Sequence, residues 1–231
     1  MNESHVPGAV PVPAPSREKL IEAAARVYAT AGFRGATTRR IAEEAGVNEV
    51  TIFRLFGSKA ALIGEAVRLH TGAPPPCAAP LPEEPVDPAT ELTAWCDAHL
   101  TMLRERRSII RQTMGELEER PEVGPCAAEG PSHAAAELKR YMRRLYALGF
   151  AERTSTAGGD RGRDEEAHAA GAMLMAALFG DAMGRDMMPE MYPQPPERAA
   201  ALYVGLFLRA IRCAPRRGAA GPATPATRTR S

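Results

Sequence analysis

The chain has 231 residues, of which 45% are hydrophobic and 25% charged, and its formal net charge is +1. These proportions are those of an ordinary soluble globular protein, and the length allows one large domain or two small ones. No run of about 18 apolar residues occurs, which excludes a membrane-spanning helix, and the near-neutral total charge identifies no partner.

The N-terminal third predicts a short disordered segment followed by four helices. Residues 1–15 are rich in Pro, Gly and Ala, and we expect them to be disordered. Apolar residues then recur at helical spacing behind the candidate N-caps Ser16, Thr37, Asn48 and Ser58. Gly32 and Gly46 are expected to end the first two helices. The expected buried residues of the next three helices are Ile41, Ala42 and Ala45, then Ile52, Phe53 and Phe56, then Leu62, Ile63, Ala66 and Leu69.

A proline-rich linker is predicted at residues 72–88, because seven of the residues 74–88 are proline and neither a helix nor a central strand can run through them. Beyond it, helices are expected at 88–104, 107–120, 132–148, 164–185 and 196–212, with a loop at 154–163. The tail from residue 214 carries arginines without acids and is expected to be disordered. The chain is therefore predicted to be all-α with about nine helices, in domains spanning 16–71 and 89–213.

The sequence contains no recognisable metal-binding or catalytic motif. The four cysteines are far apart, with no histidine at metal-ligand spacing, so we expect reduced thiols in a cytoplasmic protein and no metal or cofactor. No HExxH, GxSxG or P-loop pattern is present, and GGDRGR at 158–163 follows no strand, so the chain is predicted not to be an enzyme. Glu116, Glu118 and Glu119 are most simply a solvated acidic helix face.

The stretch TTRRIAEEAGVNEVTIFRLFGSKAAL, residues 37–62, raises a more specific hypothesis. A short helix, a tight turn and a second short helix are typical of a helix-turn-helix, whose second helix presents its N-terminal residues to base edges in the major groove. Residues 16–70 carry nine Lys or Arg and six Asp or Glu, a net charge of +3. The alternative is a pair of ordinary surface helices with caps and a solvated charged face.

The dense pattern favours the first hypothesis. AAARVYATAGFRGATTRRIAEEAGV and TIFRLFGSKAAL resemble the DNA-binding domain of TetR-family transcriptional regulators. The resemblance is specific over residues 16–69, about a quarter of the chain; elsewhere it concerns only the helical layout and length. It implies an N-terminal three-helix DNA-binding domain followed by a helical ligand-binding and dimerisation domain. The expected function is a ligand-responsive regulator, with repression as its expected direction, that binds a palindromic operator as a dimer and is released by a small molecule.

The resemblance also implies which residues touch DNA. By position they are Thr37, Thr38, Arg39, Asn48, Glu49, Val50, Thr51, Phe53, Arg54 and Lys59. Phe53 replaces the usual tyrosine and Leu55 a frequent histidine, so two phosphate donors are missing. Glu49 stands where lysine is common; its acid would either repel phosphate or accept a hydrogen bond from a cytosine N4 amine.

The C-terminal helices are predicted to carry the regulatory functions. The last two helices have long apolar faces and small residues such as Ala167, Ala170, Gly171 and Ala177, which permit a four-helix interface between two subunits; the alternative is that they pack only within one subunit. A pocket for an unknown, largely apolar effector would use Trp95, His99, Met102, Met114, Leu117, Tyr141, Leu145, Met175 and Phe179. Met and aromatic residues at such spacing are more often core.

Two other functions remain open from the sequence. One is a DNA-binding protein of the same fold without small-molecule control, either architectural or regulated by a protein partner. The other is a thiol-regulated factor in which Cys96 or Cys126 is the sensor. DNA selectivity separates the first from a regulator, and thiol titration separates the second.

Overall fold

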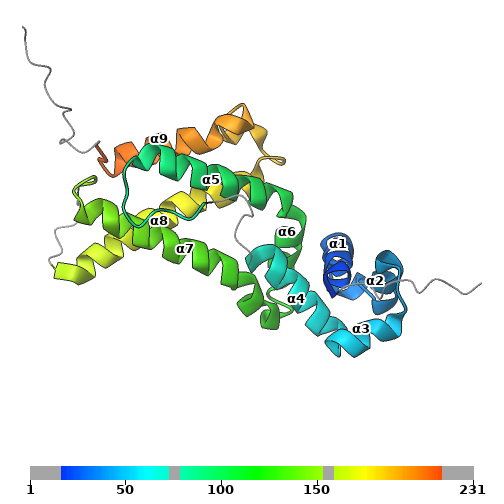
Figure 1. Ribbon diagram of the computed structural model, residues 1–231. Coiled ribbons are helices and arrows are strands. Elements are labelled where there is room, and N and C mark those ends of the chain that lie inside the picture. The colour runs from blue at the N-terminus through cyan, green and yellow to red at the C-terminus, as the bar shows by residue number, and fades with distance from the viewer. Residues whose placement is uncertain (1–16, 73–78, 153–158, 215–231) are drawn as a thin grey trace, which may run out of the picture. The chain divides into compact units, whose positions relative to one another are not determined.

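The computed structural model describes residues 17–72, 79–152 and 159–214, and within these ranges the chain is helical throughout, without a strand (Figure 1). The α-helices are α1 (Arg17–Gly35), α2 (Thr38–Ala45), α3 (Glu49–Phe56), α4 (Lys59–Gly72), α5 (Pro88–Glu105), α6 (Arg107–Glu116), α7 (Gly124–Ala147), α8 (Gly159–Gly184) and α9 (Ala199–Ala210). Three short 3-10 helices, η1 (Pro121–Val123), η2 (Pro189–Met191) and η3 (Pro196–Arg198), lie in the connections. The all-α prediction is confirmed. No helix in the described ranges is long and apolar enough to cross a membrane.

The chain divides into two compact units. In the described residues, the first unit contains 17–72 and 108–128, and the second contains 79–107, 129–152 and 159–214. Residues 108–128 were expected in the C-terminal domain, but they pack with the N-terminal helices. The predicted segments 1–15 and 215–231 and the central part of the linker, 73–78, lie outside the described residues.

In the first unit, α1 packs on α4 and α2, while α3 contacts α2 and α4 (Figure 1). The local signals behave as the sequence predicts. The Thr37 side chain accepts a hydrogen bond from Arg40 N, the Asn48 side chain accepts one from Val50 N, and Ser58 Oγ accepts one from Ala61 N. Such caps satisfy amides that have no partner inside the helix and define where each helix begins.

The bend near the end of α1 depends on a glycine. Gly32 was expected to end this helix, but the helix bends there and continues to Gly35. Gly32 has φ 64° and ψ −177°, a conformation that is essentially restricted to glycine. A Cβ at this position would also lie 2.8 Å from Gln112 Nε2 and 2.8 Å from Glu116 Oε1. Gly32 therefore permits both the change in chain direction and the close approach of α6.

Three expected buried residues are exposed. Phe53 is 50% exposed and Leu69 43% exposed, although Ile52, Leu62, Ile63 and Ala66 are fully buried as predicted. Met114, expected in the apolar stripe of its helix, is also 50% exposed. α3 is only eight residues long, so it buries one narrow line of side chains and leaves the neighbouring apolar residues outside.

The second unit is built from α5, α8 and α9, with α5 packed on both others, and from the larger part of α7. Leu92, Trp95, Cys96, Leu138 and Leu174 are all nearly inaccessible to solvent. The described part of the predicted linker is tied to this unit: the Leu81 amide donates to Glu137 Oε1 at 2.7 Å, and the Leu81 side chain is buried.

Several other helix boundaries differ from the prediction, and α9 begins at Ala199 because residues 196–198 form η3. α6 ends at Glu116, four residues early, and α7 begins at Gly124 rather than Ser132, with Pro131 inside the helix. α8 begins at Gly159, within the expected loop, of which residues 153–158 lie outside the description. Asp164 does not cap it, because its carboxylate pairs with Lys139 Nζ at 2.7 Å and Arg143 Nε at 3.2 Å.

A buried carboxylate links three helices of the second unit. Asp181 on α8 is inaccessible to solvent and accepts hydrogen bonds from Arg104 Nη2 at 2.9 Å, Arg185 Nε at 2.8 Å and the Tyr203 hydroxyl at 2.9 Å. Burial opposes its ionisation, but the hydrogen bonds from Arg185, Arg104 and Tyr203 outweigh this and hold the pKa of Asp181 below its ordinary value of 3.8. The network joins α5, α8 and α9.

We expect Gly32→Ala to destabilise the protein by about 1–3 kcal/mol, because alanine is strained at this φ and its methyl group meets Gln112 and Glu116. Gly115→Ala is the matched control: it lies in α6 with no neighbour within 4 Å of its Cβ position. That change should stabilise the helix by up to about 1 kcal/mol. Urea unfolding followed by circular dichroism measures both; equal effects of the two substitutions would contradict the role of Gly32.

Asp181→Ala leaves the buried Arg185 and the partly buried Arg104 without their carboxylate partner and should cost about 3 kcal/mol at pH 7. Because the native pKa is depressed, this contribution is present above pH 3.8 and is lost as the pH falls through the lower native value. The difference from the unsubstituted protein should therefore shrink below about pH 4. Asp97→Ala, an exposed change on α5, should alter the unfolding midpoint little, and a similar loss there would contradict the assignment.

Candidate nucleic-acid interface

The candidate interface is the pair of helices α2 and α3 with the turn between them. α2 ends at Gly46, whose φ of 68° is left-handed, and α3 begins two residues after Val47 behind the Asn48 cap. Two capped helices of eight residues each, joined by this short turn, form a helix-turn-helix. The geometry places the first turn of α3 at an exposed end of the pair.

The ten predicted DNA-contacting residues divide by exposure. Six are exposed, namely Thr37, Arg39, Asn48, Val50, Phe53 and Arg54, and four are partly buried, namely Thr38, Glu49, Thr51 and Lys59. Val50 is 70% exposed, although an isolated valine at a helix surface gains nothing from water. The exposed face of α3 therefore carries both apolar and polar side chains, as expected of a surface that contacts another molecule.

Of the three arginines on α2 and α3, Arg39 is paired with an acid and Arg40 donates to Gly35 O at 2.9 Å. Arg39 Nε lies 2.9 Å from Glu43 Oε1, and the hydrogen bond from Glu43 raises the pKa of Arg39. Arg26 Nε on α1 lies 2.8 Å from Glu44 Oε1. Arg54 has no hydrogen-bond or ion-pair partner among the described residues, which leaves its guanidinium available.

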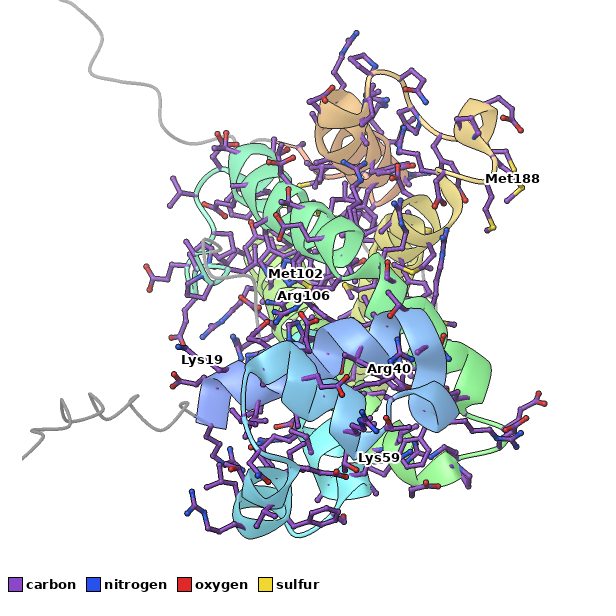
Figure 2. All side chains as sticks on the ribbon, turned by 90° about the vertical axis from the view of Figure 1, so that its right-hand side faces the viewer. Lys19, Arg40, Lys59, Met102, Arg106 and Met188 are labelled. Atoms are coloured by element: carbon purple, nitrogen blue, oxygen red, sulfur yellow. The ribbon has the colours of Figure 1, made fainter. Side chains whose placement is uncertain are left out.

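Lys59, one of the predicted DNA-contacting residues, contacts Phe33 near the end of α1. Its ammonium donates to Phe33 O at 2.8 Å and lies 4.0 Å from the centre of the Phe33 ring (Lys59 is marked in Figure 2). Arg120 stacks on the same ring at 3.3 Å. Burial, with the nearby Arg120 charge, lowers the pKa of Lys59.

Glu116 is a residue that the sequence analysis misjudged. It was expected on a solvated acidic face, but its carboxylate accepts from Phe33 N at 2.7 Å, from the Tyr28 hydroxyl at 3.0 Å and from Gln112 Nε2 at 2.9 Å. Burial and the contact with Glu116 raise the pKa of Tyr28 to about 12. The sequence contained an indication of this role. Residues 109, 113, 116 and 120 lie on one face of a helix, and Ile109 on that face is buried, so Glu116 could be expected to face the protein interior.

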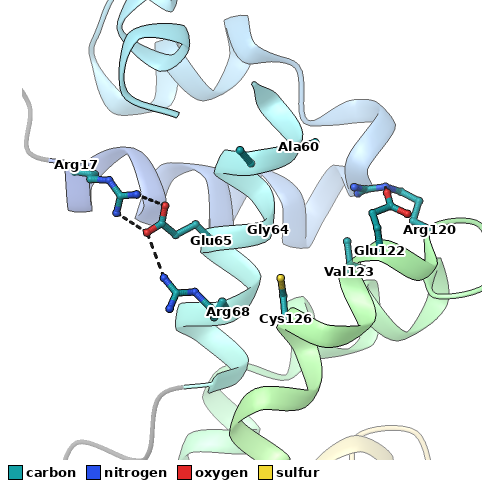
Figure 3. A pocket seen from close by; sticks show the side chains of 10 residues that line it. Arg17, Ala60, Gly64, Glu65, Arg68, Arg120, Glu122, Val123 and Cys126 are labelled. Carbon is teal, nitrogen blue, oxygen red and sulfur yellow. Dashed lines mark hydrogen bonds and ion pairs between the residues drawn. The ribbon is translucent and has the colours of Figure 1, made fainter. Parts of the chain in front are cut away.

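A surface pocket of about 460 Å³ also belongs to the first unit (Figure 3). Glu65 on α4 pairs there with Arg17 and, at 3.5 Å, with Arg68, while Cys126 lines the pocket from α7 (Figure 3). Its arginines are thus already engaged with carboxylates. No set of three or more His, Cys, Asp or Glu side chains in the described ranges could hold a metal ion.

The nine predicted effector-contacting residues are not all in one unit. Met114 and Leu117 lie in the first unit, and the other seven lie in the second. Trp95, His99, Tyr141 and Leu145 are buried, whereas Met102, Met175 and Phe179 are partly exposed. A cavity of about 590 Å³ in the second unit is lined by other residues, among them Thr93, Asp97 and Ala201.

Trp95 and His99 form a polar core feature of α5. Their rings stack with centroids 3.6 Å apart, Trp95 Nε1 donates to Glu137 Oε2 at 3.2 Å, and His99 Nδ1 lies 2.8 Å from Trp95 O. Burial lowers the pKa of His99, so the imidazole is neutral at pH 7. Burial also raises the pKa of the Cys96 thiol to about 12, which disfavours the reactive thiolate and a sensor role for Cys96.

Comparison with known proteins identifies the N-terminal helices. The sequence profile described as "Bacterial regulatory proteins, tetR family" matches residues 20–66, which contain α2 and α3. An uncharacterized HTH-type transcriptional regulator of Bacillus subtilis (strain 168), YvkB, is 37% identical over 57 residues. Residues 20–66 therefore match the DNA-binding region of TetR-family regulators. The match with YvkB covers 25% of this chain and 30% of that relative.

Solved structures extend the TetR-family fold to most of the chain. A TetR-family regulator from Mesorhizobium loti MAFF303099 has a TM-score of 0.64 at 20% identity, covering 84% of this chain and 95% of that one. A transcriptional regulator from Pseudomonas aeruginosa PAO1 has a TM-score of 0.67 at 21% identity, covering 84% and 88%. At these identities the likeness shows the fold alone. The matched profile and YvkB are both described as regulators rather than enzymes, in line with the prediction of no enzymatic activity.

Glu116→Ala should destabilise the TetR-family fold of the first unit by about 1–3 kcal/mol, because the Phe33 amide and the Tyr28 hydroxyl lose their acceptor. Glu118→Ala is the control, since Glu118 is exposed on the turn after the same helix. Thermal unfolding by circular dichroism tests both. An equal shift of the midpoint for the two variants would contradict the role of Glu116.

Proposed function

We propose that this TetR-family protein is a repressor that binds a palindromic operator as a homodimer and leaves it when a small molecule binds. The observation that carries the proposal is that the family match over residues 20–66 coincides with a capped helix-turn-helix whose second helix is exposed. In such a motif the second helix enters the major groove. The protein would act in the cytoplasm, where operator DNA is accessible.

DNA binding would combine few phosphate contacts with base contacts. The Thr37, Asn48 and Thr51 side chains, together with Arg54 and the N-terminal amides of α2 and α3, suit phosphate oxygens. Arg39 would have to exchange Glu43 for a phosphate. We therefore expect modest non-specific affinity with a shallow salt dependence, because few phosphates are neutralised.

Dimerisation through α8 and α9 is supported by apolar side chains on their outer surfaces. Leu202 and Leu206 on α9 are 40% and 58% exposed, and Met173 on α8 is 51% exposed. Ala167 and Ala170 are buried inside the unit, and Gly171 faces Leu138 of α7, so these small residues serve packing within one subunit. The exposed alanines of α8, Ala169, Ala172 and Ala176, could instead permit close approach of a second copy.

Effector binding rests on the partly exposed apolar residues of the second unit. Met102, Met175 and Phe179 are partly exposed, whereas Trp95 and Tyr141 of the same unit are buried. Methionine adapts to irregular apolar ligands. Release would follow if the effector favours a conformation whose two helix-turn-helix motifs are wrongly spaced for half-sites about one turn apart.

The deciding experiment titrates the full chain against DNA from upstream of its own gene and against scrambled DNA, at two salt concentrations. Tight, selective, salt-weakened binding supports the proposal and provides an assay for effector screening. Equal binding to both DNAs would favour an architectural protein instead. If neither DNA is bound, selection from genomic fragments distinguishes a distant operator from an inactive motif.

Leu206→Glu should place a charge in the proposed dimer interface and convert dimers to monomers. Operator affinity should then fall by at least tenfold, because one subunit reads only one half-site. Val86→Glu is the matched control, since Val86 is 81% exposed and precedes α5. Analytical ultracentrifugation measures the oligomeric state, and an unchanged dimer in the Leu206 variant would exclude this part of α9 from the interface.

A further inference from the structure

We propose that Glu49 is a specificity-determining residue that selects a cytosine in each operator half-site, with Thr38 as its positioning residue. In this arrangement one carboxylate oxygen of Glu49 accepts a hydrogen bond from the Thr38 hydroxyl, and the other accepts one from the N4 amino group of cytosine in the major groove. The inference rests on the proposed function, since it requires α3 to lie against base edges.

Glu49 occupies the place from which a recognition helix reads bases. It is the first residue of α3, directly after the Asn48 cap, and the first residues of such a helix contact base edges. The following residue, Val50, is 70% exposed and offers no hydrogen-bonding group. Glu49 is therefore the ionic group nearest the exposed tip of α3.

The carboxylate is held rather than freely mobile. Thr38 Oγ1 on α2 donates to Glu49 Oε1, and Glu49 is only partly exposed. The N-terminal end of α3 carries the positive end of the helix dipole, which stabilises an acid there. Among the described residues Oε2 has no hydrogen-bond or ion-pair partner, and the nearby Arg39 forms its ion pair with Glu43 instead. One oxygen is thus positioned by the protein while the other remains available.

The chemistry of the groove then selects the base. In the major groove only the cytosine N4 and adenine N6 amino groups donate hydrogen bonds. Adenine places its N7 acceptor beside N6, where it repels a second carboxylate oxygen, whereas cytosine has no acceptor on its own edge. A carboxylate therefore favours cytosine, and it disfavours any register that brings it close to a phosphate. Thus the same charge that weakens non-specific binding improves selectivity.

The test uses full-length protein and an operator obtained by selection from genomic fragments. A duplex panel substitutes all four base pairs at each half-site position, and fluorescence anisotropy gives the affinities. The variants are Glu49→Gln, Thr38→Val and Thr38→Ser, with Glu44→Gln as the matched control, because it removes the same charge from α2 at a residue paired with Arg26. Circular dichroism verifies that each variant is folded.

The unsubstituted protein should favour C·G over the other pairs by about tenfold or more at one half-site position. Glu49→Gln should lose that preference and shift toward adenine, to whose N6 and N7 a glutamine amide is complementary, while binding scrambled DNA more tightly. Thr38→Val should weaken the preference at the same position alone, and Thr38→Ser should restore it because the hydroxyl returns. Glu44→Gln should leave every base preference unchanged.

Two results would overturn the inference, and they are distinguishable. Selective operator binding whose preferences are identical in Glu49→Gln and the unsubstituted protein would overturn it while the proposed function stands. Equal affinity of the unsubstituted protein for selected and scrambled DNA would overturn the proposed function, and this inference with it.

Discussion

The first unit depends on the hydrogen bond from the Phe33 amide to the Glu116 carboxylate. This bond joins α6 to the bend near the end of α1, where the absence of a side chain at Gly32 leaves room for it. Lys59 of α4 and Arg120 of the connection after α6 both contact the Phe33 ring. The position of the helix-turn-helix on α1 is therefore coupled to α6, a helix far away in the sequence.

Charge in the DNA-facing helices is largely balanced within the protein. Arg26 of α1 and Arg39 of α2 pair with glutamates, and Thr38 donates to Glu49, so these two cations are not free for phosphate. Phosphate contacts provide affinity without sequence information. With fewer of them, a larger share of the binding energy must come from contacts to base edges, and an acid at the first position of α3 is consistent with this.

The second unit buries a charged group and exposes apolar side chains, whereas a simple helical bundle does the reverse. A carboxylate with two guanidinium partners is buried at Asp181, while leucines of α9 are on the surface. Figure 2 marks Met188 in the turn after α8, where Met187 and Met191 are also exposed. A buried ion network orders the ends of α8 and α9, and their outward apolar residues are then available to a second copy.

The helical class, the helix caps at Thr37, Asn48 and Ser58 and the resemblance to TetR-family regulators could be predicted from the sequence, because they depend on residues within a few positions of each other. The sequence also indicated the ten candidate DNA-contacting residues, whose contacts with DNA stay a prediction. The folded structure was needed to find that Glu116 is a structural acceptor, that residues 108–128 pack with the N-terminal helices, and that Thr38 donates a hydrogen bond to Glu49. Each of these involves a partner from another helix, and local periodicity contains no information about which distant helix will supply it.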